Sequence, residues 1–401
     1  MVLPGPAMRI LMISDVYFPR VNGVSTSIQT FRRALDALGH RVDLVAPQYK
    51  GAGLEDGGIF RIPSRYLPLD PEDRIMQTGK IRSLRPQLRE RGYDLVHVQT
   101  PFVAHYLGIE IADALGVPRV ETYHTFFEEY LFHYVPFVPK RWLRAASRRL
   151  SRTQCNQMDA LIVPSMAMGE VLGRYGVRAP VHVVPTGIPL GEFAAGNGMV
   201  FRSRWRIPTE RPMLLYVGRV AFEKNIDFLL RALQRALVWM PELLLVIAGE
   251  GPASASLKRQ AAKRRLQEHV VFVGYLERSV ELLDCYRAAD AFVFASRTET
   301  QGLVLLEALA LGVPVISTAV MGTRDIVGPR RGAVVPADDE TAFAEAIVAV
   351  MRDAGWRARL ADEGRAYARE WRAEPLARKL AAVYESVAAR RASAEPVSCP
   401  L

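Results

Sequence analysis

The chain has 401 residues, half of them apolar and 23% charged, and this composition excludes a largely disordered or fibrous protein. That length exceeds what one hydrophobic core usually fills, so two domains are expected. The 52 Lys and Arg against 42 Asp and Glu give a formal net charge of +10, which favours an anionic partner such as a phosphate-rich ligand, an acidic membrane surface or nucleic acid.

Cysteine usage and hydropathy bear on the compartment. Cys155, Cys285 and Cys399 are widely scattered and lack the spacing of a zinc site or a disulfide framework. No apolar run approaches the roughly 18 to 20 residues that a membrane span needs. We therefore expect a cytoplasmic protein without a membrane span, and residues 1–7 are interpreted as a frayed extension before the first strand.

Short apolar runs alternate with helical periodicity along almost the whole chain. In the first half, the predicted strands are 10–13, 42–46, 95–98, 119–122 and 160–163. In the second half, they are 213–217, 243–248, 270–273, 291–294 and 313–317. Apolar strands separated by helices predict a parallel sheet covered on both faces. The expected fold class is α/β, with two doubly wound Rossmann-like domains.

The two halves are separated by segment 185–212, where glycine and proline are frequent and the alternation pauses. We place the domain boundary there, with residues 1–195 as the N-terminal domain and 196–370 as the C-terminal domain. The remaining segment, 371–401, is expected to begin with one or two amphipathic helices and to end in a flexible tail.

A basic loop follows the first predicted strand of the second domain. Gly218, Arg219 and Lys224 lie between that strand and a helix predicted at 228–237. Open α/β sheets bind ligands at the carboxyl ends of their strands, and an Arg fork beside a Lys point charge suits a diphosphate. The alternative is a solvated surface loop.

Two carboxylates, Glu299 and Glu307, flank an apolar run that is predicted to begin a helix near Gly302. The free N–H groups of a helix start favour an anion, and a glycine lets phosphate oxygens approach closely. Carboxylates on either side can accept hydrogen bonds from sugar and ribose hydroxyls. The alternative is a helix start whose acidic residues only complement the helix dipole.

Two further positions follow strands in the first half. Gly23 and Val24 lie between the first strand and a helix predicted at 26–38, where a glycine serves either ligand approach or a tight turn. The dinucleotide fingerprint GxGxxG is absent there, so hydride transfer is disfavoured. His124 follows the strand at 119–122, although a lone histidine is more often structural than catalytic.

Taken together, these stretches resemble the retaining glycosyltransferases of family 4, which have the GT-B architecture. The resemblance covers nearly the whole chain and rests on four motifs in order: Gly23, His124, the loop from Gly218 to Lys224, and the pair Glu299 and Glu307. It implies two parallel sheets that face a central cleft. It also implies a C-terminal helix that crosses back to the N-terminal domain.

The resemblance implies that the chain binds a nucleotide-diphosphate sugar. It assigns catalytic positions to His124, Arg219, Lys224 and Glu299. It assigns donor-binding positions to Gly23, Val24, Gly218, Gly274, Tyr275, Gly302, Leu303, Val304 and Glu307. In this assignment Arg219, Lys224 and the helix start hold the diphosphate, Glu307 binds the ribose and Glu299 the transferred sugar. His124 contacts the sugar near the reacting carbon, and the base lies near Gly274 and Tyr275.

Leaving-group stabilisation is the main electrostatic task that such an enzyme performs. Arg219, Lys224 and the helix start suit that task, and no DxD sequence occurs in the chain. We therefore expect a reaction that needs neither a metal nor another cofactor.

The acceptor is predicted from strings that are most similar to the family branch that glucosylates diacylglycerol, namely 124–130, 133–134 and 300–302. A basic stretch at 140–152 would rest on anionic lipid headgroups, with Trp142 and Leu143 dipping into the membrane. These features predict transfer of glucose from a UDP-sugar to a lipid acceptor, by a protein bound peripherally at the inner face of the membrane.

Several alternatives stay open. The basic stretch is otherwise an ordinary solvated helix. The motifs do not distinguish a UDP-sugar from GDP-mannose, so a GDP-mannose-dependent α-mannosyltransferase is the second interpretation. A catalytically degenerate nucleotide-sugar-binding protein is the third. Nucleic acid is not an expected partner, because no nucleic-acid-binding module is recognisable.

Overall fold

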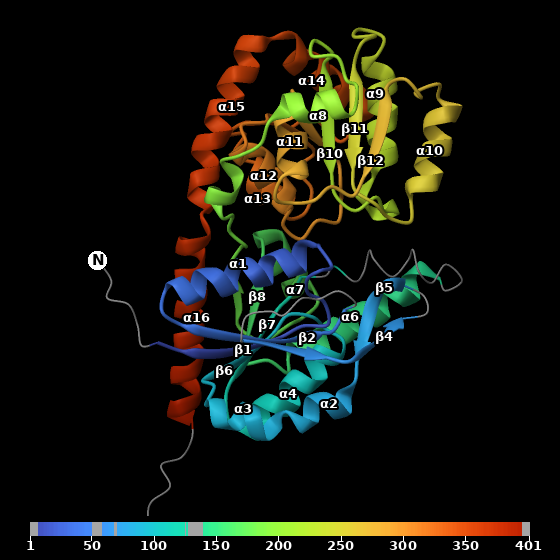
Figure 1. The fold of residues 1–401 in the computed structure, drawn as a ribbon. Coiled ribbons are helices and arrows are strands. Elements are labelled where there is room, and N and C mark those ends of the chain that lie inside the picture. Colours follow the sequence, from blue (N-terminus) through green and yellow to red (C-terminus); the bar gives the residue numbers. More distant parts are fainter. Residues whose placement is uncertain (1–6, 50–57, 68–69, 125, 127–138, 395–401) are drawn as a thin grey trace, which may run out of the picture. The chain divides into compact units, whose positions relative to one another are not determined.

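The computed structural model describes residues 7–49, 58–67, 70–124, 126 and 139–394 (Figure 1). These residues form two compact units. The first contains the described residues up to Gly187 and those from Ala373 onward, and the second is Ile188–Arg372. Residues 1–6 and 395–401, which include most of the expected frayed start and the end of the expected tail, lie outside the described residues.

The first unit is built from parallel strands and crossover helices. Its strands are β1 (Arg9–Ile13), β2 (Arg41–Pro47), β3 (Ile59–Ile62), β4 (Ser64–Leu67), β5 (Asp70–Met76), β6 (Leu95–Val98), β7 (Arg119–Thr122), β8 (Ala160–Val163) and β9 (Val181–Val183). Its helices are α1 (Gly23–Ala37), α2 (Thr78–Ser83), α3 (Arg85–Arg91), α4 (Val103–Leu115), α6 (Lys140–Cys155), α7 (Met166–Arg174) and α16 (Ala373–Ala394).

The main sheet of this unit has seven described strands, in the order β3-β2-β1-β6-β7-β8-β9. Every neighbouring pair in it is parallel. The strand order runs to one side of β1 through β2 and β3 and to the other side through β6, β7, β8 and β9. Because parallel crossovers are right-handed, α1, between β1 and β2, covers one face of the sheet, and α4, between β6 and β7, covers the other (Figure 1). A separate antiparallel hairpin joins β4 and β5.

The last helix, α16, packs against α1 in this unit and crosses it at a steep angle (Figure 1). Its Leu380 and Val387 are buried in the same core as Ile28 of α1. The Tyr384 hydroxyl lies 2.6 Å from Nδ1 of buried His97 on β6. These contacts confirm the prediction that the C-terminal helix packs on the N-terminal domain.

The second unit follows the same plan. Its strands are β10 (Met213–Val217), β11 (Leu244–Ala248), β12 (Val270–Gly274), β13 (Ala291–Phe294), β14 (Val315–Ser317) and β15 (Ala333–Val334). Its longer helices are α8 (Gly198–Arg204), α9 (Ile226–Ala236), α10 (Ser254–Lys263), α11 (Glu281–Ala288), α12 (Leu303–Ala310), α13 (Thr323–Val327), α14 (Glu340–Arg352) and α15 (Ala354–Ala368). Short 3-10 turns are η2 (Leu190–Phe193), η3 (Phe222–Lys224) and η4 (Arg369–Trp371).

The sheet of the second unit has six described strands, in the order β12-β11-β10-β13-β14-β15. All neighbouring pairs are parallel, and the order reverses at β10. The predicted strands therefore exist, with ends that differ from the prediction by at most two residues. The α/β class with two doubly wound domains is confirmed.

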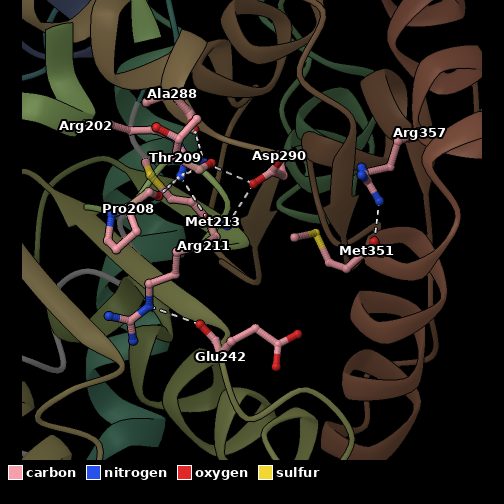
Figure 2. Close-up of polar contacts among 10 residues, drawn as sticks. All are labelled: Arg202, Pro208, Thr209, Arg211, Met213, Glu242, Ala288, Asp290, Met351 and Arg357. Carbon is pink, nitrogen blue, oxygen red and sulfur yellow. Dashed lines mark hydrogen bonds and ion pairs between the residues drawn. The ribbon is translucent and has the colours of Figure 1, made fainter. Parts of the chain in front are cut away.

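The chain enters the second unit through a segment tied by the buried guanidinium of Arg202 (Figure 2). Arg202 donates to the carbonyls of Pro208, Thr209, Arg211 and Ala288 and to the carboxylate of Asp290. A buried charge is tolerated only when its donors are satisfied in this way.

Residues just after Gly187 belong with the second unit. The Ile188 N–H donates to the Trp371 carbonyl at 2.8 Å, and Phe193 lies in the second core. Along the chain, the boundaries between the units therefore lie after Gly187 and after Arg372. The sequence pattern placed these boundaries after 195 and 370.

Acid should destabilise the first unit through His97. Burial lowers the pKa of His97 from 6.5 to about 3, and the charge of His124 adds to this effect. As pH falls below the unfolded value, the unfolded chain binds a proton that the folded chain does not, so stability is lost between the two pKa values. From about pH 7 to about pH 5, the wild type should lose about 2 kcal/mol more unfolding free energy than His97→Gln.

Urea unfolding of both chains at the two pH values measures this difference. Glutamine keeps hydrogen-bonding groups beside Tyr384 and Thr122 but does not titrate. An equal loss in the two chains would show that His97 is not responsible.

Candidate functional site

The loops at the carboxyl edge of the second sheet approach each other closely. The Gly249 N–H, just after β11, donates to the Gly274 carbonyl at 2.7 Å. A Cβ on Gly249 would lie 2.0 Å from the Gly218 carbonyl oxygen, which leaves no room for a side chain. Gly218 and Gly274, two of the predicted donor-binding positions, therefore both lie against the backbone of Gly249.

Lys224 and Glu299 are direct partners in the second unit. Lys224 ends the η3 turn after β10, and Glu299 lies in the loop after β13. The Lys224 Nζ lies 2.6 Å from Glu299 Oε1, and the side chains are 21% and 18% exposed. An ammonium has three donors, so this contact leaves Lys224 further donors for a ligand.

Two neighbouring contacts hold these loops together. The Asn225 side-chain amide donates to the Ala295 carbonyl at 3.0 Å, and the Thr298 hydroxyl donates to the Glu223 carbonyl at 3.3 Å. Arg219, on the same loop, is partly buried, with Nη1 3.9 Å from Glu223 Oε1. The predicted cations Arg219 and Lys224 thus both lie at this edge of the sheet.

The predicted helix start near Gly302 is present as α12. Gly302 is its N-cap, with φ of +97° and ψ of 55°, a conformation that favours glycine. The first N–H groups of a helix have no partner within the helix, and here they belong to Leu303 and Val304. Glu307 lies one turn into α12 and Glu299 in the preceding loop, as the sequence predicts.

Glu307 is buried and already has two donors. It forms an ion pair with Arg278, and the Tyr286 hydroxyl donates to its Oε2 at 3.0 Å. The charge of Glu307 raises the pKa of Arg278, and burial followed by the same charge raises the pKa of Tyr286 well above its ordinary value. The sequence pattern did not predict either partner, although Arg278 closely follows the predicted base-binding residues Gly274 and Tyr275.

The predicted base-binding positions end β12. Gly274 has a φ of +74°, and a Cβ there would lie 3.5 Å from the Glu250 carboxylate. Tyr275 is an exposed aromatic residue. Burial, with the charge of Glu277 adding to it, raises the pKa of its phenol.

Gly23 lies in the first unit as the first residue of α1, not in a turn ahead of the helix. Its N-cap is Asn22, whose side chain accepts the Ser25 N–H at 2.8 Å. A Cβ on Gly23 would meet nothing within 4 Å, and its φ is not in the left-handed region. Within the described residues, neither backbone nor packing requires a glycine there. Val24 follows it and is half-buried.

His124 also belongs to the first unit, just after β7. Its Nε2 lies 3.1 Å from the Gln99 side-chain oxygen. Burial lowers the pKa of His124 to about 4, so the imidazole is neutral at pH 7. Of the string that follows His124, residues 125 and 127–134 lie outside the described residues.

The basic stretch forms helix α6, with Ser147 and Ser151 on its buried side. Trp142 and Leu150 are exposed, at 63% and 45%. Leu143 is half-buried, so it projects outward less than the sequence pattern predicts. Leu150, rather than Leu143, is the apolar residue that is exposed together with Trp142, and it lies about two turns away on the same side of the helix.

Neither a metal cluster nor a membrane span is present in the parts of the chain that the structure describes. No group of three or more His, Cys, Asp or Glu among these residues is arranged to hold a metal ion. No helix in these parts of the chain is long and apolar enough to cross a membrane.

Comparison with known families covers both units. Residues 21–192 match the family model described as Glycosyltransferase Family 4, and residues 200–367 match the one described as Glycosyl transferases group 1. The chain belongs to glycosyltransferase family 4. It is therefore similar along most of its length to enzymes that transfer sugars.

Curated relatives include two α-monoglucosyldiacylglycerol synthases. The one from Streptococcus pneumoniae is 37% identical over 77% of this chain and 71% of its own length. The one from Acholeplasma laidlawii is 28% identical over 77% and 80%. A GDP-mannose-dependent α-mannosyltransferase of Mycobacterium tuberculosis is 31% identical over 82% and 84%.

Solved structures agree on the fold. Sucrose-phosphate synthase from Thermosynechococcus elongatus has a TM-score of 0.74 at 23% identity, covering 96% of this chain and 100% of that one. WaaG, a glycosyltransferase of lipopolysaccharide biosynthesis, has a TM-score of 0.71 at 18% identity, covering 93% and 99%. The family 4 chain thus has the GT-B fold.

Removing Arg278 should destabilise the second unit, because Glu307 would keep a buried charge without its cation. Since the Arg278 side chain is 28% exposed, water compensates in part, and we expect Arg278→Ala to cost about 2 kcal/mol of unfolding free energy. The double variant Arg278→Ala with Glu307→Gln should recover most of that loss, because the glutamine side chain carries no charge and its oxygen still accepts from Tyr286. Urea unfolding measures all three chains, and a double variant as unstable as the single one would contradict the assignment.

Proposed function

We propose that this family 4 enzyme transfers a hexose, preferentially glucose, from a UDP-sugar to a lipid acceptor such as diacylglycerol. The transfer proceeds with retention of configuration at the anomeric carbon and without a metal ion. The observation that carries the proposal is the contact between Lys224 and Glu299. It joins a cation suited to a diphosphate to a carboxylate suited to sugar hydroxyls.

The donor phosphates would be held by charge and by a helix end. As the bond between the anomeric carbon and the diphosphate oxygen breaks, negative charge grows on the departing diphosphate. Lys224, Arg219 and the first N–H groups of α12 would stabilise that charge. Fixed cations supply this stabilisation without a divalent ion, so the enzyme should work in the presence of a chelator.

The sugar and the ribose would be held by the two carboxylates. Glu307 keeps unused lone pairs beside those that accept from Arg278 and Tyr286, and these would accept ribose hydroxyls. Glu299 would accept hydroxyls of the transferred hexose. In the first unit, a neutral His124 would contact the hexose near the reacting carbon, and Gly23 would leave room for the diphosphate.

The acceptor assignment is supported by the two relatives named α-monoglucosyldiacylglycerol synthase. Helix α6 supports it independently, because exposed Trp142 and Leu150 lie beside exposed arginines such as Arg149. An apolar stripe flanked by cations suits an anionic lipid surface. We place the enzyme at the inner face of the membrane.

A second candidate is a GDP-mannose-dependent α-mannosyltransferase. The relative so named in Mycobacterium tuberculosis is 31% identical over 82% of this chain, and one from Mycolicibacterium smegmatis is 30% identical over 96%. A third candidate, a binding protein without catalysis, gives no reason for Lys224 and Glu299 to be paired beside a helix start.

Replacing Lys224 by Ala should lower kcat by about 100-fold to 1,000-fold, because it removes a group that acts on developing charge. Lys263→Ala, an exposed position on α10, is the matched control and should leave kcat unchanged. Transfer of labelled sugar to diacylglycerol vesicles, with UDP-glucose and with GDP-mannose and with chelator present, measures the effect. Near-wild-type turnover of Lys224→Ala would refute the role of Lys224; turnover with GDP-mannose alone would select the second candidate.

Replacing Trp142 by Ala should weaken binding to phosphatidylglycerol vesicles by about tenfold to 100-fold, since burying a large apolar side chain is worth roughly 1.5 to 3 kcal/mol. Trp239→Ala is the matched control, because Trp239 is also exposed, at 44%, but lies in the second unit. Cosedimentation with vesicles measures both. Equal binding by the two variants would show that α6 does not touch the lipid.

A further inference from the structure

The hairpin β4–β5 of the first unit carries an arginine stacked between two tyrosines. Tyr66 lies opposite Arg74 across the antiparallel pair, so their side chains share one face of the hairpin. The Arg74 guanidinium carbon lies 4.0 Å from the centre of the Tyr66 ring. It lies 4.8 Å from the centre of the Tyr49 ring, which follows β2.

This stack leaves hydrogen-bond donors unused. Stacking engages the faces of a guanidinium and leaves its N–H groups directed outward in the plane. Arg74 has no ion pair with any residue that the structure describes, and its buried Nε has no hydrogen-bond partner there. The Tyr49 hydroxyl is also buried, and its proton has no acceptor among the described residues.

Two more arginines bring positive charge to the same place. Burial raises the pKa of the Tyr49 phenol, and the charges of Arg20, Arg74 and Arg61 all oppose that rise. Arg61 lies over the Tyr17 ring at 5.3 Å and donates to the Pro47 carbonyl at 3.0 Å. Three cations thus lie near enough to one phenol, after the carboxyl end of β2, to affect its pKa.

We propose that Tyr49, Tyr66 and Arg74 form a binding site for a phosphate group, with Arg20 and Arg61 adding charge. A phosphate has several acceptor oxygens in the fork geometry that a guanidinium matches, and the Tyr49 hydroxyl supplies one more donor. The phosphate belongs either to a lipid headgroup or to a soluble molecule. This phosphate site lies in the first unit and shares no residue with the candidate site of the second unit. The proposal does not depend on which acceptor the enzyme uses.

The experiment titrates the full chain with inorganic phosphate at constant ionic strength, by calorimetry. Arg74→Gln should weaken binding by at least about tenfold, the loss of a two-pronged charge-assisted contact. Tyr49→Phe should weaken it by about threefold, the loss of one hydrogen bond. Arg65→Gln is the matched control on the same hairpin. Arg65 is exposed and lies opposite Ile75 on the other face, so its variant should bind within about twofold of the wild type.

Tyr49→Phe separates binding from folding, because it removes a hydroxyl with no acceptor among the described residues and should not lower the melting temperature. Vesicles of phosphatidylglycerol with phosphatidylcholine identify the source. Weaker vesicle binding by Arg74→Gln, with phosphate competing in the wild type, supports a headgroup. Unchanged vesicle binding with phosphate affinity lost supports a soluble phosphate compound. Failure of the wild type to bind either probe, or equal losses in Arg65→Gln and Arg74→Gln, would overturn the site.

Discussion

Parallel pairing of β10 with β11 on one side and β13 on the other fixes where the loops of the second unit lie. Parallel strands end at the same edge, so every connection starts from that edge. Lys224 follows β10 and Glu299 follows β13, two neighbouring strands, and the residues meet although 75 positions separate them. The ion pair is thus a consequence of strand order. The close approach of Gly218 and Gly249 is a separate contact, between the loops after β10 and β11.

The same constraint organises the first unit, where β1, β6 and β7 are neighbours. Asp15 follows β1 and accepts from the Thr100 hydroxyl, which follows β6, at 2.8 Å. Gln99, the next residue back, contacts His124 beyond β7. Burial raises the pKa of Asp15 to about 6 and lowers that of His124, so both groups are held toward their neutral forms by the same edge of the sheet.

The sequence predicted the strands and helix starts that depend on a local pattern of apolar residues and glycines. Apolar runs such as 213–217 are buried on both faces, and the helix start at Gly302 has a positive φ that favours glycine. Pattern could not predict β5, because Asp70–Met76 has no alternation of apolar and polar residues. It also could not find Arg278, whose contact with Glu307 depends on how the loop after β12 packs against α12. The side of α6 that faces inward was missed for a similar reason, since buried Ser147 and Ser151 do not look apolar.

The two carboxylates of the candidate site differ in burial, and this difference bears on what each can do. The side chains of the Lys224–Glu299 pair are 21% and 18% exposed, so water reaches both partners and a ligand can rearrange this pair more easily than a fully buried one. Glu307 is buried between Arg278 and Tyr286, and a buried, doubly bonded carboxylate resists movement. A rigid hydrogen-bond acceptor such as Glu307 suits the part of a sugar nucleotide that does not change during the reaction. An adaptable ion pair such as Lys224 with Glu299 suits the part where charge develops and bonds change. The division of the motif into one fixed and one adjustable carboxylate therefore follows from where α12 begins.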